Sequence, residues 1–261
     1  MTGYTAAEEY LQAASEADLL YVLPGLGQYV AGDFVAPEGP GLLVEYCDEQ
    51  VLADGGERLL SEVVACFPGS RSVLLRVPAS VQLPPPWRPD LTYLRHEGTR
   101  PAFVPACVRR AEPHEDGLVR GWLVRALRDG SVSRGEEPDA AALDAAAERV
   151  MAAHGRESWV WTADGSPVGH ATVQTDAYDA VTDSPYVELE DILIESPYQK
   201  RAMGDLVAAC VHRAGLLGLP LIGNVVHTVA DPDASIRVIA GLEAHGWRPD
   251  HRVWRRDLTA E

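Results

Sequence analysis

Basic residues are scarce in this sequence. Lysine occurs once, at Lys200, and the 22 lysines and arginines face 39 aspartates and glutamates, which gives a formal net charge of −17 at pH 7. A chain this acidic is repelled by phosphate backbones, so we expect no nucleic-acid partner. A cationic small molecule or a basic peptide is favoured if the charge lies near a site. Much of the excess lies in residues 1–60, where a solvated acidic surface explains it equally well.

Cysteines and long apolar runs are also few. The four cysteines are scattered, with no CxxC pair and no histidine at zinc-finger spacing, so neither a disulfide framework nor a metal site is expected. No stretch approaches the roughly 20 apolar residues that a membrane helix needs. The first residues carry acids where a signal peptide carries bases. We therefore expect a soluble, cytoplasmic protein with no membrane partner.

Apolar residues, in contrast, are numerous enough for a substantial core. They make up 46% of the 261 residues, which suits one large domain or two modest ones. The pattern changes near Arg100–Val104, after the proline-rich turn Pro84–Pro86 and a strand-like run at Leu91–His96. We therefore predict two domains, residues 1–103 and residues 104–261.

The upstream domain is predicted to contain a β-α-β unit followed by another strand. Gly41–Tyr46 and Ser72–Val77 have the composition of short strands, and Glu57–Phe67 between them has the spacing of an amphipathic helix. The sequence Trp-Arg-Pro-Asp occurs at Trp87–Asp90 and again at Trp247–Asp250, each time before a last strand. This echo favours a degenerate copy of the second domain in residues 1–103, and an accessory αβ domain is the alternative.

The downstream domain is predicted to alternate strands and helices in the order β-α-α-β-β-β-α-β-α-β. An Asp-Gly pair between two apolar runs predicts a tight hairpin turn at Ala163–Ser166. The ten segments are Val104–Arg110, Asp116–Asp129, Asp139–His154, Ser158–Thr162, Pro167–Thr175, Tyr186–Ile194, Ala202–Leu217, Leu219–Val226, Ser235–His245 and His251–Leu258.

The segment Glu188–Gly204 carries the most informative pattern. It predicts a strand that runs into a small-residue turn, which then opens an apolar helix. The free N–H groups and the positive dipole end of such a helix favour a pyrophosphate there. Lys200 and Arg201 would add positive charge beside it.

Here the sequence resembles the GNAT acetyltransferase superfamily over about residues 104–261. The family signature Arg/Gln-x-x-Gly-x-Gly/Ala is matched by Gln199–Gly204, with Ala202 at the first glycine position, and Gly246-Trp247 resembles the usual Gly-Phe. The resemblance implies a GNAT-like α/β fold with a mixed sheet. It also implies acetyl-CoA as co-substrate, no metal, and transfer of the acetyl group to a primary amine.

The resemblance further implies which residues hold the co-substrate. Backbone groups of the strand would bind the pantetheine arm like an added strand, and the helix start would bind the pyrophosphate. The implied residues are Ile192, Leu193, Ile194, Gln199, Lys200, Arg201, Ala202, Met203, Gly204, Asp205 and Ser235.

The catalytic candidates are two glutamates of the preceding strand. Glu188 lies where several relatives have a general base, Glu190 is the second candidate, and strand alternation puts both on one face with Asp191 on the other. Solvated or salt-bridged carboxylates are the alternative, and His227 is a further candidate base. Leu242 stands where many relatives carry a tyrosine that protonates the leaving thiolate, so an acid must come from elsewhere or is not needed.

Three functions remain open at this point. The first is N-acetylation of a small-molecule amine, the second is acyl-CoA binding or sensing without transfer, and the third is acetylation of a peptide or protein. The acceptor is set by loops around residues 118–150 and 176–186, which carry no recognisable motif. The resemblance also permits a homodimer and an acyl group larger than acetyl.

Overall fold

A computed structural model describes residues 5–36, 39–98 and 104–258. In this part of the chain all strands join one mixed sheet of 11 strands, in the order β1-β2-β3-β4-β11-β5-β10-β9-β8-β7-β6. The predicted domain boundary near Arg100–Val104 falls mostly on residues 99–103, outside the described residues. The strands are β1 (Leu20–Leu23), β2 (Gly27–Ala36), β3 (Gly39–Cys47), β4 (Ser72–Pro78), β5 (Arg88–His96), β6 (Val108–Arg110), β7 (Arg156–Ala163), β8 (Ser166–Asp179), β9 (Ser184–Ile194), β10 (Leu221–Val226) and β11 (Arg248–Asp257).

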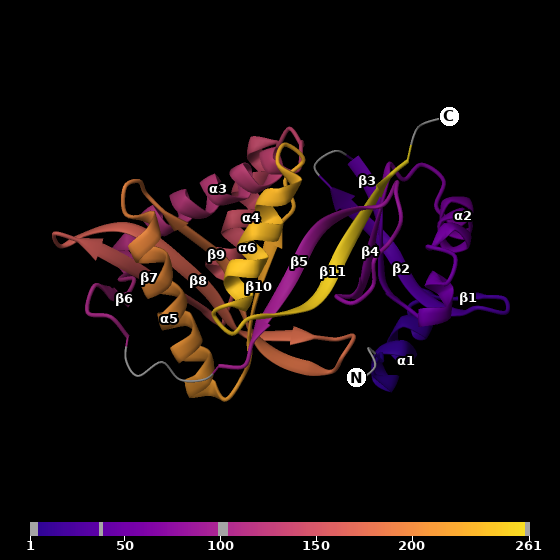
Figure 1. The fold of residues 1–261 in the computed structure, drawn as a ribbon, viewed down its shortest axis with the longest axis horizontal. Coiled ribbons are helices and arrows are strands. Elements are labelled where there is room, and N and C mark those ends of the chain that lie inside the picture. Colours follow the sequence, from indigo (N-terminus) through magenta and orange to yellow (C-terminus); the bar gives the residue numbers. More distant parts are fainter. Residues whose placement is uncertain (1–4, 37–38, 99–103, 259–261) are drawn as a thin grey trace.

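Helices cover both faces of the sheet (Figure 1). The described helices are α1 (Glu8–Glu16), α2 (Glu57–Cys66), α3 (Asp116–Ser133), α4 (Ala140–Ala152), α5 (Gln199–Leu217) and α6 (Pro232–Glu243), with short 3-10 turns at Glu49–Leu52 and Pro113–Glu115. Helix α5 packs on Trp161 and Val173, whereas α3 and α4 pack on Val160 and Leu193, which point to the opposite face. Among the described residues, no helix is both long and apolar enough to cross a membrane.

The predicted order of elements in residues 104–261 is confirmed, with shifted boundaries. Asp164 (φ 50°) and Gly165 (φ 81°) form the turn between β7 and β8, as the Asp-Gly pair predicts. The first strand is shorter than predicted and covers only Val108–Arg110. Helix α5 begins at Gln199 rather than Ala202, so the signature segment is the start of the helix and not a loop before it.

The order of strands shows that the two parts of the chain exchange their last strands. Strand β5, from the upstream part, lies between β10 and β11, and β11, from the end of the chain, lies between β4 and β5. Figure 1 shows β11 running beside β4, away from the other C-terminal strands. The sheet is therefore continuous across the expected boundary, although the separation into residues 1–103 and 104–261 stays a prediction.

The upstream part repeats the topology of the downstream part. Strands β3 and β4 pair in parallel around α2, with Leu42–Val44 opposite Val73–Leu75, and β9 and β10 pair in parallel around α5, with Val187–Leu189 opposite Leu221–Gly223. Both β3 and β9 contain a one-residue bulge directly after these pairs. The shared bulge and the shared Trp-Arg-Pro-Asp segments at the starts of β5 and β11 support a degenerate copy.

Candidate functional site

The two parallel strands β9 and β10 diverge beyond their third residue pair. Pairing is recorded for Val187–Leu189 with Leu221–Gly223, after which β9 continues beside β8 and β10 continues beside β5. The backbone edge of Ile192–Ile194 that faces β10 therefore has no strand partner in the described chain. An open edge of this kind can bind an extended chain by main-chain hydrogen bonds.

The start of α5 lies directly after the open end of β9. The first N–H groups of a helix have no partner within it, so Gln199, Lys200 and Arg201 present N–H donors and the positive dipole end. All three side chains are exposed, whereas Ala202 is fully buried in the core, so its methyl group points away from this surface. A Cβ on Gly204 would meet nothing within 4 Å, so the exposed side of the first helical turns has room for a ligand.

Two of the predicted co-substrate residues have other partners in the structure. The Asp205 carboxylate accepts hydrogen bonds from the Trp161 indole (2.9 Å) and the Cys107 thiol (3.3 Å), which tie α5 to β7 and to the residue before β6. The Ser235 hydroxyl is buried, donates to the carbonyl of Pro232, and lies 2.8 Å from Nδ1 of His227.

His227, the further candidate base, is enclosed by hydroxyl groups. Its Nε2 lies 2.8 Å from Oγ1 of Thr92, and its Nδ1 contacts Ser235. Burial, together with the charge of Arg252, lowers its pKa, so the ring is neutral near pH 7. Because both ring nitrogens are engaged, this histidine fixes the beginning of α6 and has no nitrogen free to accept a substrate proton.

The corresponding place in the upstream part is closed to anions. The Asp54 carboxylate accepts hydrogen bonds from the N–H groups of Gly56 (3.1 Å) and Arg58 (3.3 Å) at the start of α2. The residue that matches Glu188 by pairing is Leu43, since Leu43 and Glu188 occupy the middle of the two parallel pairings. This half therefore offers neither an anion site nor a carboxylate at the position of Glu188, although Glu45 occupies its bulge as Glu190 occupies that of β9.

Glu188 lines a cavity of about 260 Å³ on the face of the sheet that is opposite α5. Residues from both parts of the chain form its walls: Leu43, Glu45, Arg76 and Tyr93 from the upstream strands, and Tyr178, Asp179, Ala180, Tyr186, Glu188, Ile222, His251 and Val253 from the downstream part. The loop around residues 176–186, expected to contact an acceptor, thus borders the same cavity as the candidate base.

Burial makes the candidate bases easier to protonate. It raises the pKa of Glu188, against a hydrogen bond from Tyr186 that lowers it. Burial, followed by the charges of Glu188 and Asp191, raises the pKa of Glu190 to about 7. A carboxylate whose pKa lies near the working pH is suited to take up and release a proton.

The predicted alternation of these carboxylates is wrong beyond Glu188. The register shifts between Thr172 and Val173 of β8 because Glu190 is an extra residue in β9. Asp191 therefore points to the α3 side, where its Oδ2 lies 3.0 Å from Nε2 of His170. Glu190 occupies the bulge itself, beside the point where β9 leaves β10.

Tyr93 and Arg76 were not among the predicted site residues. Tyr93 stacks on His251 with ring centroids 4.3 Å apart, and burial followed by the charge of Glu188 raises its pKa to about 12. Arg76 forms a bidentate ion pair with Asp179 (2.6 and 3.0 Å) and so holds the β8–β9 hairpin over the cavity. The hairpin is also fixed by the N–H of Ala7, which donates to the carbonyl of Val181.

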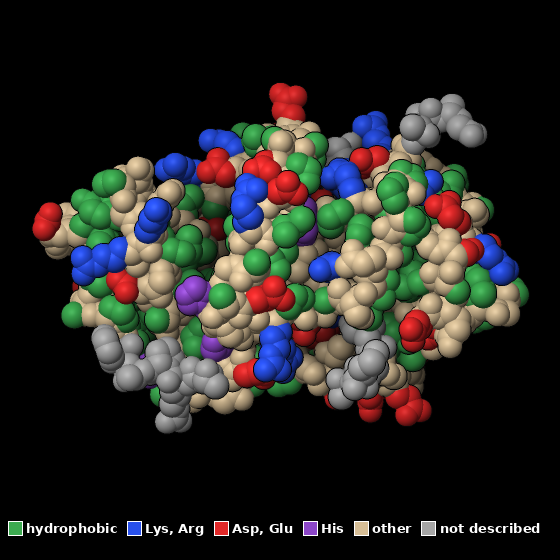
Figure 2. All heavy atoms as spheres, viewed as in Figure 1, with side chains coloured by type: hydrophobic (Ala, Val, Ile, Leu, Met, Phe, Trp, Pro, Cys, Tyr) green, Lys and Arg blue, Asp and Glu red, His purple; other side chains and the backbone are tan. Residues whose placement is uncertain are grey.

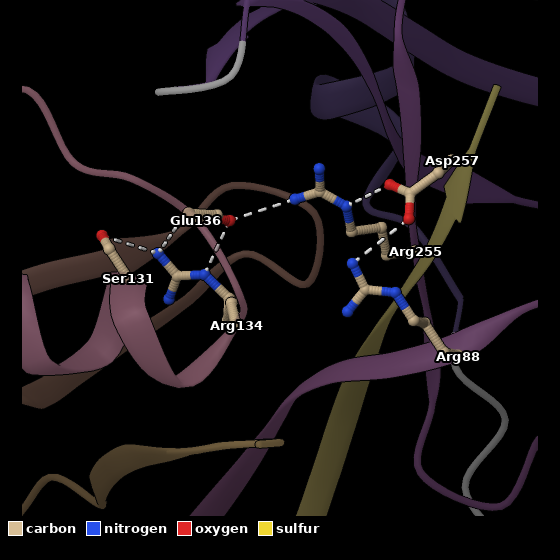
Figure 3. Close-up of polar contacts among 6 residues, drawn as sticks. All are labelled: Arg88, Ser131, Arg134, Glu136, Arg255 and Asp257. Carbon is tan, nitrogen blue, oxygen red and sulfur yellow. Dashed lines mark hydrogen bonds and ion pairs between the residues drawn. The ribbon is translucent and has the colours of Figure 1, made fainter. Parts of the chain in front are cut away.

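An ion network centred on the buried Glu136 and Arg255 holds the segment after α3 against the sheet (Figure 3). Glu136 accepts hydrogen bonds from Arg134 (3.0 Å) and Arg255 (3.1 Å), and Asp257 joins Arg255 (2.7 Å) to Arg88 (3.3 Å). The network connects the other expected acceptor region, residues 118–150, to the exchanged strands β5 and β11. In the described part of the chain, no three His, Cys, Asp or Glu side chains are grouped to hold a metal ion.

Solved structures of acetyltransferases resemble this chain over most of its length. One, an acetyltransferase of the GNAT family from Colwellia psychrerythraea, has a TM-score of 0.52 and 9% sequence identity, covering 97% of each chain. Another, a GCN5-related N-acetyltransferase from Sphaerobacter thermophilus, has a TM-score of 0.51 and 14% identity, covering 91% of this chain and 79% of its own. No protein-family model and no curated protein matches the sequence. At these identities the likeness establishes the fold, and the architecture expected from the resemblance is confirmed.

Proposed function

Because the chain has the fold of the GNAT acetyltransferases, we propose that it transfers an acetyl group from acetyl-CoA to a primary amine of a small molecule. One observation carries the proposal. Strands β9 and β10 diverge beside the exposed start of α5, and the strand that forms this opening carries Glu188 into a cavity. This arrangement supports a donor site and a proton acceptor on the two sides of one strand.

The residues of the chain fit an acyl-CoA. The pyrophosphate would lie at the N–H groups of Gln199–Arg201, with the Lys200 side chain beside it, and the open edge of Ile192–Ile194 would hold the pantetheine arm. When bound, acyl-CoA supplies a thioester carbonyl for attack. Asp205 and Ser235 would support the site from within, since their polar atoms are already engaged by the protein.

The proposed role of Glu188 is to accept a proton from the acceptor. An amine arrives protonated near pH 7, and its nitrogen attacks only after one proton has left. Glu188 lines the cavity, and Glu190 is the bulge residue two positions further along β9. Either carboxylate can hold that proton while the nitrogen reacts. The same carboxylates, with Glu45 on the opposite wall, favour an acceptor that carries positive charge.

The test is release of free thiol from acetyl-CoA in the presence of a panel of primary amines, with mass spectrometry of the products. We expect thiol release that depends on the amine and an equal amount of an acetylated product. An acylated product that appears only with longer acyl-CoA donors would retain the reaction and change the donor. No product with any donor would contradict the transferase proposal.

A second candidate, acyl-CoA binding without transfer, is favoured by one observation. Leu242 packs against the hydrophobic core, so α6 offers no hydroxyl where many relatives have a tyrosine acid. In that case calorimetry would detect acetyl-CoA binding while the amine panel gives no product.

The amine panel should include a peptide with a free N-terminus, which tests peptide acetylation. Light scattering tests whether the chain forms the homodimer that the resemblance permits, and the cytoplasmic location stays a prediction.

A further inference from the structure

A second and larger cavity, of about 580 Å³, lies on the opposite face of the sheet from Glu188. Its floor includes Pro89 of β5 and Trp254 of β11, one wall is α6 with Ile236 and Ala240, and Gln82 borders it from the other side. The cavity exists because the two halves differ here. Residues 227–247, between β10 and β11, contain α6, whereas residues 79–87, between β4 and β5, contain no helix.

Most of the lining of this cavity is apolar. Ile236 is 60% exposed and Val229 is 57% exposed, although both are large hydrophobic residues that border the cavity. Figure 2 shows hydrophobic side chains along this face, where α6 meets the N-terminal half of the molecule. Exposed apolar side chains around a concave surface favour a ligand with an apolar body.

One cation in the cavity, Arg252, forms no ion pair with the described residues. Arg252 of β11 lines the cavity and is half-buried, its Nε is buried without a hydrogen-bond partner, and it forms no ion pair with the described part of the chain. Burial lowers the pKa of Arg252, against the charge of Glu243, which raises it. A partly desolvated guanidinium is costly unless a carboxylate or another anion lies beside it.

The neighbouring arginines make this absence informative. Arg88 of β5 also lines the cavity and pairs with Asp257. Arg255, which lies on β11 as Arg252 does, pairs with both Asp257 and Glu136 (Figure 3). Glu243 borders the cavity from the exposed edge of α6 and forms no ion pair with Arg252. His227, the other titratable neighbour, is held by Thr92 and Ser235.

We propose that this cavity binds a small organic carboxylate with an apolar body, whose carboxylate pairs with Arg252 and whose body packs against α6 and Trp254. The site is separate from the proposed acetyl transfer and does not depend on it. The ligand would occupy space that is open because no helix lies between β4 and β5, where the downstream half has α6.

The test is calorimetry of the full-length protein with three probes of equal chain length: octanoate, octanol and octylammonium. We expect octanoate to bind at least roughly tenfold more tightly than the other two, because only octanoate completes the charge pair. Arg252→Met should weaken octanoate binding roughly 10- to 100-fold and leave octanol binding unchanged. Arg248→Met is the matched control, since Arg248 is an exposed arginine of the same strand that does not line the cavity.

Glu243→Gln gives a second test of the same binding, which applies even if Arg252→Met does not fold. Glu243 is exposed, so Glu243→Gln should fold normally and should strengthen octanoate binding severalfold by removing a nearby negative charge. Equal binding of octanoate and octanol, or octanoate binding that neither variant alters, would overturn the proposal. Failure of the amine panel to give product would leave these results unchanged, so the two proposals fail separately.

Discussion

Glu190 is a carboxylate that the fold holds at a cost. Its pKa rises from 4.5 in the unfolded chain to about 7 because it is half-buried beside Glu188 and Asp191. Below pH 4.5 the group is protonated in both states and has no effect on stability. Between pH 4.5 and 7 the folded state keeps a proton that the unfolded state releases, so stability falls as pH rises, and above pH 7 the full penalty is present.

Glu190→Gln should therefore stabilise the protein at pH 8 and not at pH 4. We expect the free energy of unfolding at pH 8 to increase by about 1–3 kcal/mol, since one pKa unit corresponds to about 1.4 kcal/mol and some of the charge is screened. Urea unfolding at the two pH values measures the change. Glu137→Gln is the control, because Glu137 is exposed. A destabilised Glu190→Gln variant at pH 8 would contradict the assigned environment.

Glu188→Gln tests the proposed base at the same scale. The substitution preserves shape, so acetyl-CoA affinity should stay the same while turnover falls by roughly 10²–10⁴-fold, the usual value of general-base catalysis. The deficit should shrink as pH rises, because more of the acceptor amine then arrives already deprotonated. Steady-state rates across pH with a confirmed acceptor give the answer. Nearly unchanged turnover at pH 7 would assign proton transfer to Glu190 or to solvent.

Single residues of the candidate site differ in how well the sequence predicts them. The place of Glu188 on the strand before the Gln199–Gly204 helix follows from the sequence, because both lie on one strand–helix unit, and its role as base stays a prediction. The position of Asp191 does not follow, since a bulge at Glu190 depends on how β8 and β9 align. Tyr93 and Arg76 lie far upstream in the sequence. They line the cavity because the pairing of β4, β11, β5 and β10 brings them near Glu188.

At the scale of elements, the start of α5 has the clearest consequence. Gly204→Glu should abolish acetyl-CoA binding, because it adds a carboxylate on the exposed surface of the first helical turns, where the pyrophosphate would lie. Gly204→Ala is the matched control. A Cβ at this position meets no atom within 4 Å, so the alanine variant should keep its affinity. Calorimetry that finds unchanged affinity in a folded Gly204→Glu variant would remove the assignment of the anion site.

The β8–β9 hairpin is a second element with a testable anchor. Arg76 and Asp179 are 11% and 14% exposed at their side chains, and they join the two parts of the chain. Asp179→Asn should lower the free energy of unfolding by about 3 kcal/mol, because the buried guanidinium loses its carboxylate partner. Asp183→Asn, at the exposed tip of the same hairpin, should change it by less than about 0.5 kcal/mol. Denaturant unfolding of both variants decides, and equal stabilities would show that the packing of Val181 and its hydrogen bond from Ala7 hold the hairpin without the ion pair.

Periodicity and turn chemistry predicted most of the downstream elements but few of those near the N-terminus. The hairpin at Asp164–Gly165 and the helix ending at Gly218 have strong local signals, since Gly165 and Gly218 adopt positive φ angles. The strands before Gly39 were missed. Strand β2 contains Gly27, Gly32 and Asp33, which weaken the alternation that identifies a strand.

At the scale of the whole molecule, the exchange of β5 and β11 was outside the reach of the sequence. The alternation of apolar and polar residues shows which face of a strand is buried. It does not show which strand lies beside it, because several neighbours can bury the same face. The repeated Trp-Arg-Pro-Asp segments indicated a duplication, but they do not specify which half receives each strand. The partner is decided by long-range pairing of β5 with β10 and β11, and of β11 with β4.

This exchange predicts that the two halves do not fold separately. A fragment of residues 104–261 lacks β4 and β5, so β11 loses both neighbouring strands and β10 presents an unpaired edge. We expect this fragment alone to show no cooperative thermal transition and no acetyl-CoA binding, whereas co-expression with residues 1–103 should restore both. Circular dichroism and calorimetry on the two preparations, beside the full-length chain, make the measurement. If the isolated fragment melted cooperatively and bound acetyl-CoA as the full chain does, residues 104–261 would be an independent domain and the exchanged strands would be dispensable.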